Sequence, residues 1–362
     1  MLIPDVCGDV RANAILSEEQ SAIVEPFKPA IAAQWDEFVR QHPEGTFFHL
    51  LGWKRALEKA FGYESCYLYA HRDKMITGVM PLFRVKNWVM GDCLMSTPFA
   101  VYGGPCAADE GSARALLAAI SRCIGKRTEF VELRMRKAPP LPGYHGSSRY
   151  VTFTTELLED EQSNFKRLPR DTRYMIRKAE KYGLRVQHGL EQLREFYKLF
   201  AISMRRLGTP VLPRSWFEDL LSEFSDCTSL LLVYAGSRPV SGVLSFRFRD
   251  TVLPYYSGAL PEANKLAANN YLYWALIKQS TKDGLRYFDF GRSKKGTGSY
   301  AFKTQWGMRV DPLDYQYYLV HRDSVPNFSP LNPKLKLATL VWSRLPLGIA
   351  TRVGPHVVRW FP

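Results

Sequence analysis

The sequence predicts an α+β protein with two tandem lobes, each a mixed sheet flanked by helices, followed by a helical C-terminal tail. Its 362 residues are enough for two domains of ordinary size, and a hydrophobic content of 46% is that of a globular protein. Helical and strand patterns alternate in both halves. In addition, the Tyr-Ala and Gly-Val dipeptides of residues 69–70 and 78–79 recur at 234–235 and 242–243. A repeat of this kind indicates a duplicated lobe.

Irregular segments divide the chain. Prolines and glycines crowd residues 138–149, so this stretch is predicted to link the lobes. In the first lobe, helical spacing predicts a helix over 51–61 that ends before Gly62, and a strand is expected over 130–135. The expected parts are a leader (1–28), the first lobe (29–137), the linker (138–149), the second lobe (150–322) and the tail (323–362).

Charge and cysteine content restrict the partners and the compartment. The net charge of +14 favours anionic partners such as phosphorylated lipid carriers, coenzyme A, tRNA or an acidic membrane face. The six cysteines form no C-x-x-C pair and have no histidine at metal-ligand spacing, which favours reduced thiols and no metal site. A signal peptide and a stretch of about 18 apolar residues are both missing from the pattern. We therefore predict a cytoplasmic protein, with peripheral contact to the inner membrane face left open.

Residues 287–307 form the candidate functional segment. A short aromatic strand leads into a glycine-rich loop that carries Arg292, Lys294 and Lys295. Such a loop can bring backbone N–H groups and cations together around an anion. Glycines after a strand are usually only a turn. The concentration of basic residues here favours substrate binding.

Aromatic residues then bracket a single lysine, because Phe302 precedes Lys303 and Trp306 follows it. Transfer of an acyl group to an amine needs a site for the developing oxyanion, and loss of one oxyanion donor costs about 3 to 4 kcal/mol. Lys303 is the best candidate for this donor. Asp289 ends the preceding strand, where it could orient the amine or hold Lys303 or Arg292. A purely structural carboxylate fits the pattern equally.

Asp289-Phe-Gly-Arg-Ser293, followed by the pattern Gly-Thr-Gly-x-Tyr-x-Phe-Lys-x-x-Trp-Gly that ends at Gly307, resembles the C-terminal signature of FemAB-related proteins. More narrowly, it is similar to the exosortase- and PEP-CTERM-associated subgroup, which accompanies exopolysaccharide gene clusters. The resemblance covers roughly residues 30–320. Supporting stretches are residues 173–183, 207–211 and 254–258.

The resemblance implies two lobes with acetyltransferase-like (GNAT) folds and transfer of an acyl or aminoacyl group to an amine. It implies no tightly bound cofactor, with acyl-coenzyme A (acyl-CoA) or aminoacyl-tRNA as the donor. It adds Phe302 to the catalytic candidates Lys303 and Asp289, because the matching Phe-Lys pair of Fem-type transferases is implicated in stabilising the transferring group. The usual Arg/Gln-x-x-Gly-x-Gly/Ala loop is not visible before the helix expected at 267–282, which counts against acetyl-coenzyme A.

A helix expected over residues 169–182 would align Arg170, Arg173, Arg177 and Lys181 on one face. Four cations on one face repel one another unless an anion or carboxylates neutralise them. The alternatives are a solvated basic face and a clamp for phosphate or carboxylate. Fem-type transferases carry a similar basic segment at the start of the second lobe, and this favours the clamp, which would contain Arg173 and Arg177.

Two neighbouring tyrosines complete the candidate site. If residues 251–258 form a strand, the two side chains point to opposite faces, so one of them is expected to face a cleft. No metal ligand is expected. The substrate-binding candidates are Arg292, Lys294, Lys295, Tyr255, Tyr256, Trp306, Arg173 and Arg177.

The predicted function is that of a FemAB-type N-acyltransferase or aminoacyltransferase acting on an anionic cell-envelope or exopolysaccharide precursor. The alternative is a non-catalytic GNAT-like binding or scaffold protein of an export system. The tail interleaves apolar and basic residues, which fits either an interfacial membrane segment or a helix packed across both lobes. Its interrupting prolines and glycines favour packing.

Overall fold

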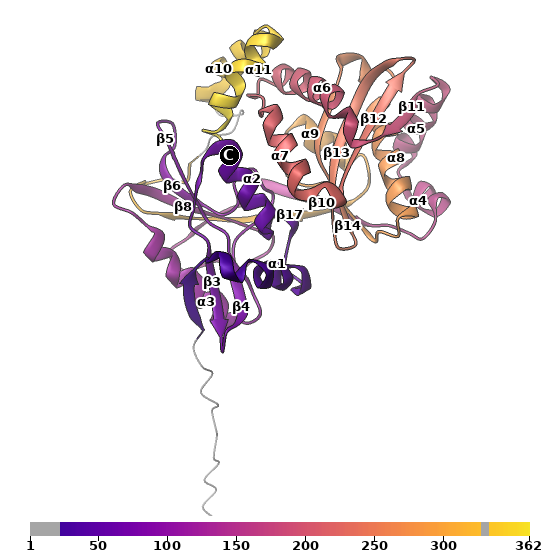
Figure 1. Ribbon diagram of the computed structural model, residues 1–362. Helices are drawn as coiled ribbons and strands as arrows, with labels where there is room; N and C mark the ends of the chain where they lie inside the picture. The colour runs from indigo at the N-terminus through magenta and orange to yellow at the C-terminus, as the bar shows by residue number, and fades with distance from the viewer. Residues whose placement is uncertain (1–21, 327–332) are drawn as a thin grey trace, which may run out of the picture.

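Two lobes lie side by side in the computed structural model, which describes residues 22–326 and 333–362 (Figure 1). Two further helices, α10 (Pro333–Arg344) and α11 (Leu347–Val358), lie at the opposite end of the molecule from α1 (Ala32–Gln41). The predicted α+β architecture with two lobes and a helical tail is therefore confirmed.

The first lobe has two sheets. One has the strand order β1 (Ile23–Pro26), β3 (Leu68–Arg72), β4 (Met75–Met80) and β7 (Cys106–Ala107). The other has the order β2 (Glu64–Ser65), β5 (Phe83–Asn87), β6 (Gly91–Met95), β8 (Thr128–Met135), β18 (Asp314–Leu319) and β9 (His145–Ser147). In this second sheet β6 and β8 run parallel, whereas the other neighbours are antiparallel. Besides α1, the helices of the lobe are α2 (Leu51–Phe61) and α3 (Glu110–Ala119).

Helix α2 illustrates how the local sequence sets these elements. Its buried residues include Trp53, Ala56, Leu57 and Phe61, whose spacing places them on one face. The helix ends at Gly62, whose φ of 65° is a left-handed conformation that glycine adopts without strain. The helix predicted over 51–61 is thus confirmed at both ends.

The second lobe has a single sheet. Its strand order is β11 (Arg185–His188), β12 (Thr228–Ala235), β13 (Arg238–Phe248), β14 (Thr251–Ala259), β15 (Tyr287–Asp289), β10 (Tyr150–Glu156) and β16 (Ser293–Lys294), and β17 (Arg309–Pro312) also pairs with β10. Its helices are α4 (Glu161–Arg167), α5 (Arg170–Lys181), α6 (Leu193–Arg206), α7 (Arg214–Phe224), α8 (Ala268–Lys282) and α9 (Gly298–Thr304). In Figure 1, α7 lies on the side toward the first lobe, while α5 and α8 lie on the far side.

The lobes share one hydrophobic core. The ring of Trp53 in α2 lies 5.2 Å from that of Trp216 in α7, and both are fully buried. Across the same boundary, Phe47 and Phe246 stack with their ring centroids 4.5 Å apart. Arg249, between β13 and β14, donates to backbone carbonyls at the C-terminal end of α1. These contacts set the orientation of one lobe against the other.

Strand β18 crosses from the second lobe to the first. It pairs with β8 and β9, so it completes a first-lobe sheet although it follows the second-lobe strands in sequence. The boundary predicted at residue 322 therefore differs from the observed pairing over residues 314–319. Strand pairing is decided by tertiary contacts, and no local pattern announces such a crossing.

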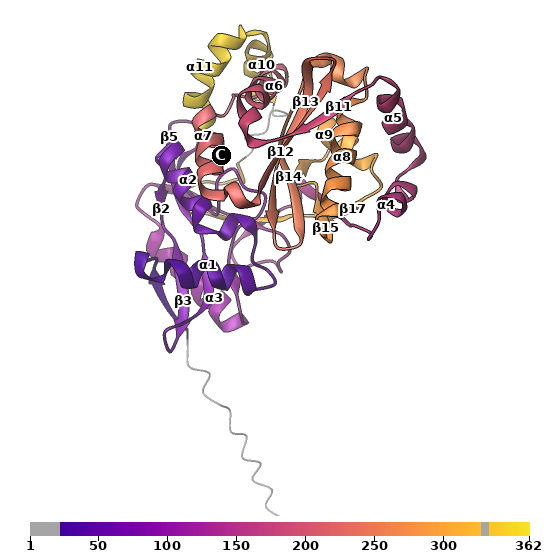
Figure 2. The ribbon, with the colours of Figure 1, turned by 45° about the vertical axis from the view of Figure 1, so that its right-hand side comes forward.

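The C-terminal helices contact both lobes, and Figure 2 shows them from a second side. Both pack against α6. Arg205 in α6 donates to the carbonyl of Leu345 (3.1 Å), and Tyr63 of the first lobe donates to that of Arg359 (2.6 Å). The predicted packing of the tail across both lobes is confirmed.

Candidate active site

Asp289 ends β15 and joins the two lobes. Its Oδ1 accepts hydrogen bonds from the Thr152 hydroxyl (2.7 Å) and the Gly291 N–H (2.9 Å), and its Oδ2 accepts one from the Tyr102 hydroxyl (2.7 Å). Tyr102 belongs to the first lobe, whereas Thr152 lies on β10 of the second. Burial, together with the Asp289 charge, raises the pKa of Tyr102, so this phenol keeps its proton and acts as a donor. The buried carboxylate is therefore held from both lobes.

Lys303, on helix α9, closes the loop that follows Asp289. Its Nζ donates to the carbonyl oxygens of Phe290 (2.5 Å), Gly291 (3.0 Å) and Arg292 (3.3 Å). An ammonium has three N–H donors, so this loop uses all of them. Burial lowers the pKa of Lys303 to about 8, and the Arg292 charge acts in the same direction. Lys303 therefore holds the loop backbone in this structure, and its role toward an oxyanion stays a prediction.

Four aromatic rings pack around this loop. Phe302 lies 5.7 Å from Tyr273 of α8 and 6.2 Å from Trp306, measured between ring centroids. Phe290 lies 4.6 Å from Tyr273. The rings join α9 and the loop to α8, so Phe302 and Trp306 support the segment that Lys303 holds.

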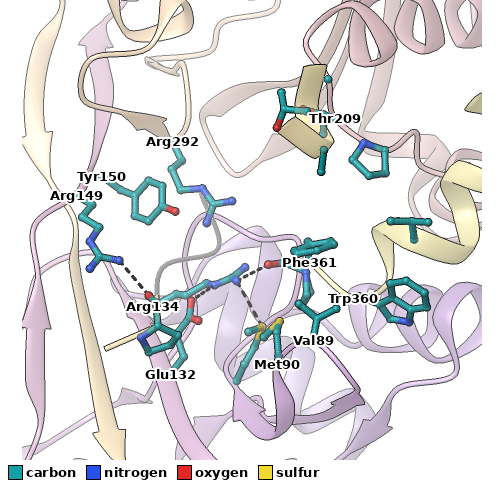
Figure 3. A pocket seen from close by; sticks show the side chains of 18 of the residues that line it. Val89, Met90, Glu132, Arg134, Arg149, Tyr150, Thr209, Arg292, Trp360 and Phe361 are labelled. Carbon is teal, nitrogen blue, oxygen red and sulfur yellow. Dashed lines mark hydrogen bonds and ion pairs between the residues drawn. The ribbon is translucent and has the colours of Figure 1, made fainter. Parts of the chain in front are cut away.

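The far end of the loop faces a cavity of about 630 Å³ (Figure 3). The Arg292 guanidinium lies 4.9 Å from the ring centre of Tyr150, and its Nη1 donates to the Tyr315 hydroxyl (3.3 Å). Arg134 and Arg149 line the same cavity. Three guanidinium groups from different segments therefore surround one space. We call it the arginine cavity.

Arg134 is buried and held on several sides. It forms an ion pair with Glu132 (2.8 Å) and donates to the carbonyl oxygens of Thr97 (3.3 Å) and Pro362 (2.8 Å). Sequence reasoning did not single out this pair. Its signal lies in the strand predicted over 130–135, where two opposite charges two positions apart share a face. Buried charges need partners, so such a pattern within a buried strand predicts an internal ion pair.

A second cavity, of about 760 Å³, is lined by Asp289 and Tyr102. Arg136 also lines it, with its guanidinium 5.2 Å from the centre of the Tyr102 ring. The arginine cavity takes part of its wall from the start of β10, and this second one from the end of that strand. Residues 289–292 therefore run from one cavity to the other, with a carboxylate at one end and a guanidinium at the other. We call the second space the aspartate cavity.

The second lobe, including most of the candidate segment, matches a known domain. Residues 166–304 match the family model of the acetyltransferase (GNAT) domain. This match includes Asp289, the arginine loop and Lys303. Compared by sequence with curated proteins, the chain matches none of them.

Solved structures show the fold of the whole chain. FemX superposes with a TM-score of 0.66 at 16% identity, covering 88% of this chain and 100% of its own. A conserved protein of unknown function from Bacteroides thetaiotaomicron gives 0.55 at 11% identity over 83% and 100% of the two chains. The tandem GNAT protein from the clavulanic acid biosynthesis pathway gives 0.52 at 11% over 84% and 100%. These likenesses confirm two tandem GNAT-like lobes. With the acetyltransferase match, they support a FemAB/GNAT-like acyltransferase.

The basic helix of the acetyltransferase domain forms as predicted. Helix α5 occupies Arg170–Lys181, within one residue of the expected range at each end. Arg173 is half-buried, and Arg177 is exposed with its guanidinium 5.3 Å from the Phe165 ring centre. Neither is among the residues that line the two cavities. The predicted phosphate clamp on this helix stays a prediction.

The two neighbouring tyrosines do point to opposite faces of β14. The Tyr255 hydroxyl donates to the carbonyl of Phe99 in the first lobe (2.5 Å), and the Tyr256 hydroxyl accepts from Trp216 Nε1 in the second (2.9 Å). Burial raises the pKa of both phenols. Tyr255 thus faces the other lobe, and both tyrosines lie in packed surroundings.

Lys294 and Lys295 lie on the outer part of the loop. Lys294 is half-buried, and burial together with the nearby Arg149 charge lowers its pKa. Lys295 is exposed. The sequence therefore located the segment, while the structure separates its inward arginine from its outward lysines. Membership of the exosortase-associated subgroup stays a prediction.

Proposed function

We propose that this protein transfers an acyl or aminoacyl group to the amine of an anionic acceptor, of the class found among cell-envelope and exopolysaccharide precursors. The observation that carries the proposal is the stretch 289–292, which runs between two cavities inside a match to an acetyltransferase domain. One end offers a carboxylate to an amine, and the other end offers a guanidinium to an anion. An acceptor that bears both groups would engage both ends.

The arginine cavity is the proposed site for the acceptor's anion. A guanidinium has five N–H donors, and among the described residues Arg292 makes one hydrogen bond, to Tyr315. Arg149 donates to the carbonyl of Pro326 (3.0 Å). Arg134, in contrast, is committed to Glu132 and to backbone carbonyls. Arg292 therefore has the donors that a bidentate contact with phosphate or carboxylate requires.

Asp289 is the proposed partner of the attacking amine. An ionised carboxylate has about four acceptor sites, and three are used here. The remaining site can accept an N–H of the amine and orient its lone pair toward the donor carbonyl. A C–N bond then forms as the C–S bond of a thioester or the C–O bond of an aminoacyl ester breaks. The proton of the amine leaves with the departing thiol or ribose hydroxyl.

Lys303 acts on this reaction through the loop. By holding three successive carbonyls it fixes the backbone between the carboxylate and the guanidinium. Direct contact with an oxyanion would require Nζ to release one of these carbonyls. We therefore assign Lys303 a positioning role first. A role as an oxyanion donor remains the second candidate for this side chain.

Two donors fit the proposal. Acetyltransferases of the GNAT class use acyl-CoA as a co-substrate, and the resemblance to Fem-type proteins adds aminoacyl-tRNA. The outward Lys294 and Lys295, with the basic face of α5, would favour a polyanion such as tRNA. Acyl-CoA carries fewer phosphates, so its affinity should depend less on salt.

The first test is donor binding to the full chain. Radiolabelled aminoacyl-tRNA and acyl-CoA are titrated at about 50 mM and about 300 mM salt, because phosphate contacts weaken steeply with salt. The variant Lys294→Glu/Lys295→Glu is compared with a matched control on α8, Lys282→Glu/Arg286→Glu. Salt-sensitive tRNA binding that only the loop variant loses supports aminoacyl transfer, and binding of acyl-CoA alone supports acyl transfer.

The second test distinguishes a catalyst from a binding protein. Lys303→Met should abolish turnover of the bound donor while leaving its binding within about threefold of wild type, since the loop and not the donor site is disturbed. A wild-type protein that binds neither donor, or binds one without turnover in the presence of amine acceptors, would replace the transferase by the scaffold alternative.

A further inference from the structure

Exposed apolar side chains gather at one end of the molecule. On α10, Leu337, Leu340 and Val341 are 71%, 48% and 55% exposed, and their spacing places them on one face. On α11, Ile349 and Val353 are 47% and 42% exposed one turn apart. Both helices pack against α6 through other residues, so these side chains have no protein cover.

An exposed tryptophan extends this surface. Trp88, in the turn between β5 and β6, is 78% exposed, and its ring lies 5.0 Å from that of Trp360 just after α11. Large exposed aromatic rings are uncommon on a soluble surface and frequent where a protein meets the headgroup region of a bilayer. We call Trp88 and the exposed apolar residues of α10 and α11 the apolar end.

The charge around the apolar end has one sign. Residues 324–362 contain five lysines and arginines and no aspartate or glutamate. Arg344 and Arg352 are exposed on α10 and α11, and no ion pair is described for either among residues 22–326 and 333–362. Two copies of such a surface would repel each other. An anionic surface would complement it.

We propose that the apolar end docks onto an anionic lipid bilayer. The aliphatic side chains would enter the boundary between headgroups and acyl chains, Trp88 would sit at headgroup level, and Arg344 and Arg352 would contact lipid phosphates. Each of the two helices has 12 residues, and within the described chain no helix is long and apolar enough to cross a membrane. The helices therefore lie on the bilayer and do not span it.

Docking in this orientation places the arginine cavity at the bilayer surface. Trp88, Trp342 and Trp360 line that cavity together with Ala338, so the apolar end and the cavity wall are continuous. Figure 3 shows Trp360 and Phe361 across this space from the arginines. This arrangement fits an amphiphile whose anionic group reaches Arg292 while its hydrocarbon chain remains among the tryptophans. This last step rests on the proposed function and narrows its acceptor to a lipid-linked anion.

Vesicle flotation of the full chain tests the docking without any transfer assay. Vesicles of phosphatidylcholine alone are compared with vesicles that contain about 30% phosphatidylglycerol, at low and high salt. Wild type should float with the anionic vesicles and release at high salt. Val341→Glu/Ile349→Glu should lose binding by at least about tenfold, whereas Met75→Glu/Val310→Glu, exposed apolar positions elsewhere, should not.

Charge is tested in the same assay. Arg344→Ala/Arg352→Ala should weaken binding on the order of tenfold, and Lys282→Ala/Arg286→Ala on α8 should not. Equal flotation with neutral vesicles, or none with either, overturns the proposal. So does a self-association in sedimentation equilibrium that Val341→Glu/Ile349→Glu abolishes, since the surface would then join two copies. Far-UV circular dichroism of each variant shows that it is folded.

The amphiphile is tested separately with octyl phosphate below its micelle concentration, followed by tryptophan fluorescence. Octyl phosphate should bind at least about tenfold tighter than inorganic phosphate, because its chain contacts the tryptophans. Arg292→Ala should weaken it, while Arg136→Ala in the aspartate cavity should not. Equal affinity for the two phosphates would overturn the lipid-linked acceptor and leave both the docking and the transfer of acyl groups to soluble acceptors standing.

Discussion

The two lobes contain the same strand arrangement and use it differently. Each has one parallel pair inside an otherwise largely antiparallel sheet, β6 with β8 in the first lobe and β14 with β15 in the second. In the first lobe, Arg134 on β8 bridges to the chain that follows β6, through the carbonyls of Thr97 and Ala100. In the second, Asp289 at the end of β15 turns instead to β10 and to the other lobe.

The difference indicates a division of labour after duplication. Only the second lobe falls within the matched acetyltransferase domain, over residues 166–304. It carries the carboxylate and the loop that Lys303 holds. At the corresponding place the first lobe carries a buried ion pair, which walls the arginine cavity. The two lobes therefore contribute opposite charges to the two ends of one short segment, and each of the following changes tests one of these contributions.

The largest effect on stability is expected in the first lobe. Arg134→Ala leaves Glu132 charged, buried and unpaired, and breaking a buried pair in this way costs about 3 to 5 kcal/mol. Urea unfolding of the purified variant measures this loss. The double variant Glu132→Leu/Arg134→Met removes both charges and should be far less destabilised. A single variant that loses under about 1 kcal/mol would mean that water reaches the pair.

The next effect is expected in the second lobe, on turnover more than on stability. Asp289→Asn preserves the shape but replaces one oxygen by an NH₂ group, which cannot accept the Tyr102 or Thr152 hydroxyl and has no charge to orient an amine. We expect donor turnover to fall at least about a hundredfold, with a loss of unfolding free energy of about 1 to 3 kcal/mol. Unchanged turnover with reduced stability would make Asp289 a structural carboxylate, the alternative that the sequence left open.

The sequence predicted what local pattern decides. Helices α2 and α5 begin and end within one residue of their expected positions because apolar spacing and Gly62 or Pro169 mark them. The repeat was right about the lobes but not about the residues. Tyr69 pairs with Val79, whereas the matching Tyr234 pairs with Pro239, so the aligned dipeptides do not occupy equivalent positions.

What the sequence did not predict depends on contacts between distant segments. The partner strands of β18, the Tyr102 bond to Asp289 and the cavity wall formed by Arg134 each join residues far apart in the chain. Lys303 was predicted as a cation at the site, and this is where it lies. That its three donors would be spent on loop carbonyls follows from the turn that the loop makes, and no motif encodes that turn.

A smaller effect concerns pH and tests how the second lobe depends on Lys303. Its pKa is lowered to about 8, so the ammonium is mostly present at pH 7 and is half lost near pH 8. Deprotonation removes one N–H donor and the charge, and the loop then loses a carbonyl contact. We expect kcat/KM to fall as pH rises through about 8, and Lys303→Arg to remove this limb of the profile. An activity that instead rises through this range would identify the neutral amine as the working form.

The smallest effect compares a contact between the lobes with one inside a lobe. Tyr102→Phe removes the Asp289 hydrogen bond that crosses the boundary, and Thr152→Val removes the one within the second lobe. A single hydrogen bond to a charged group contributes about 1.5 to 3 kcal/mol, and we expect each variant to lose a similar amount of unfolding free energy near the lower value. A double-mutant cycle of each with Asp289→Asn isolates the two couplings. If the lobes are held together by their shared aromatic core, the two couplings are equal; if the boundary opens readily, the coupling across it is the weaker one, because the Tyr102 bond is then broken in part of the population.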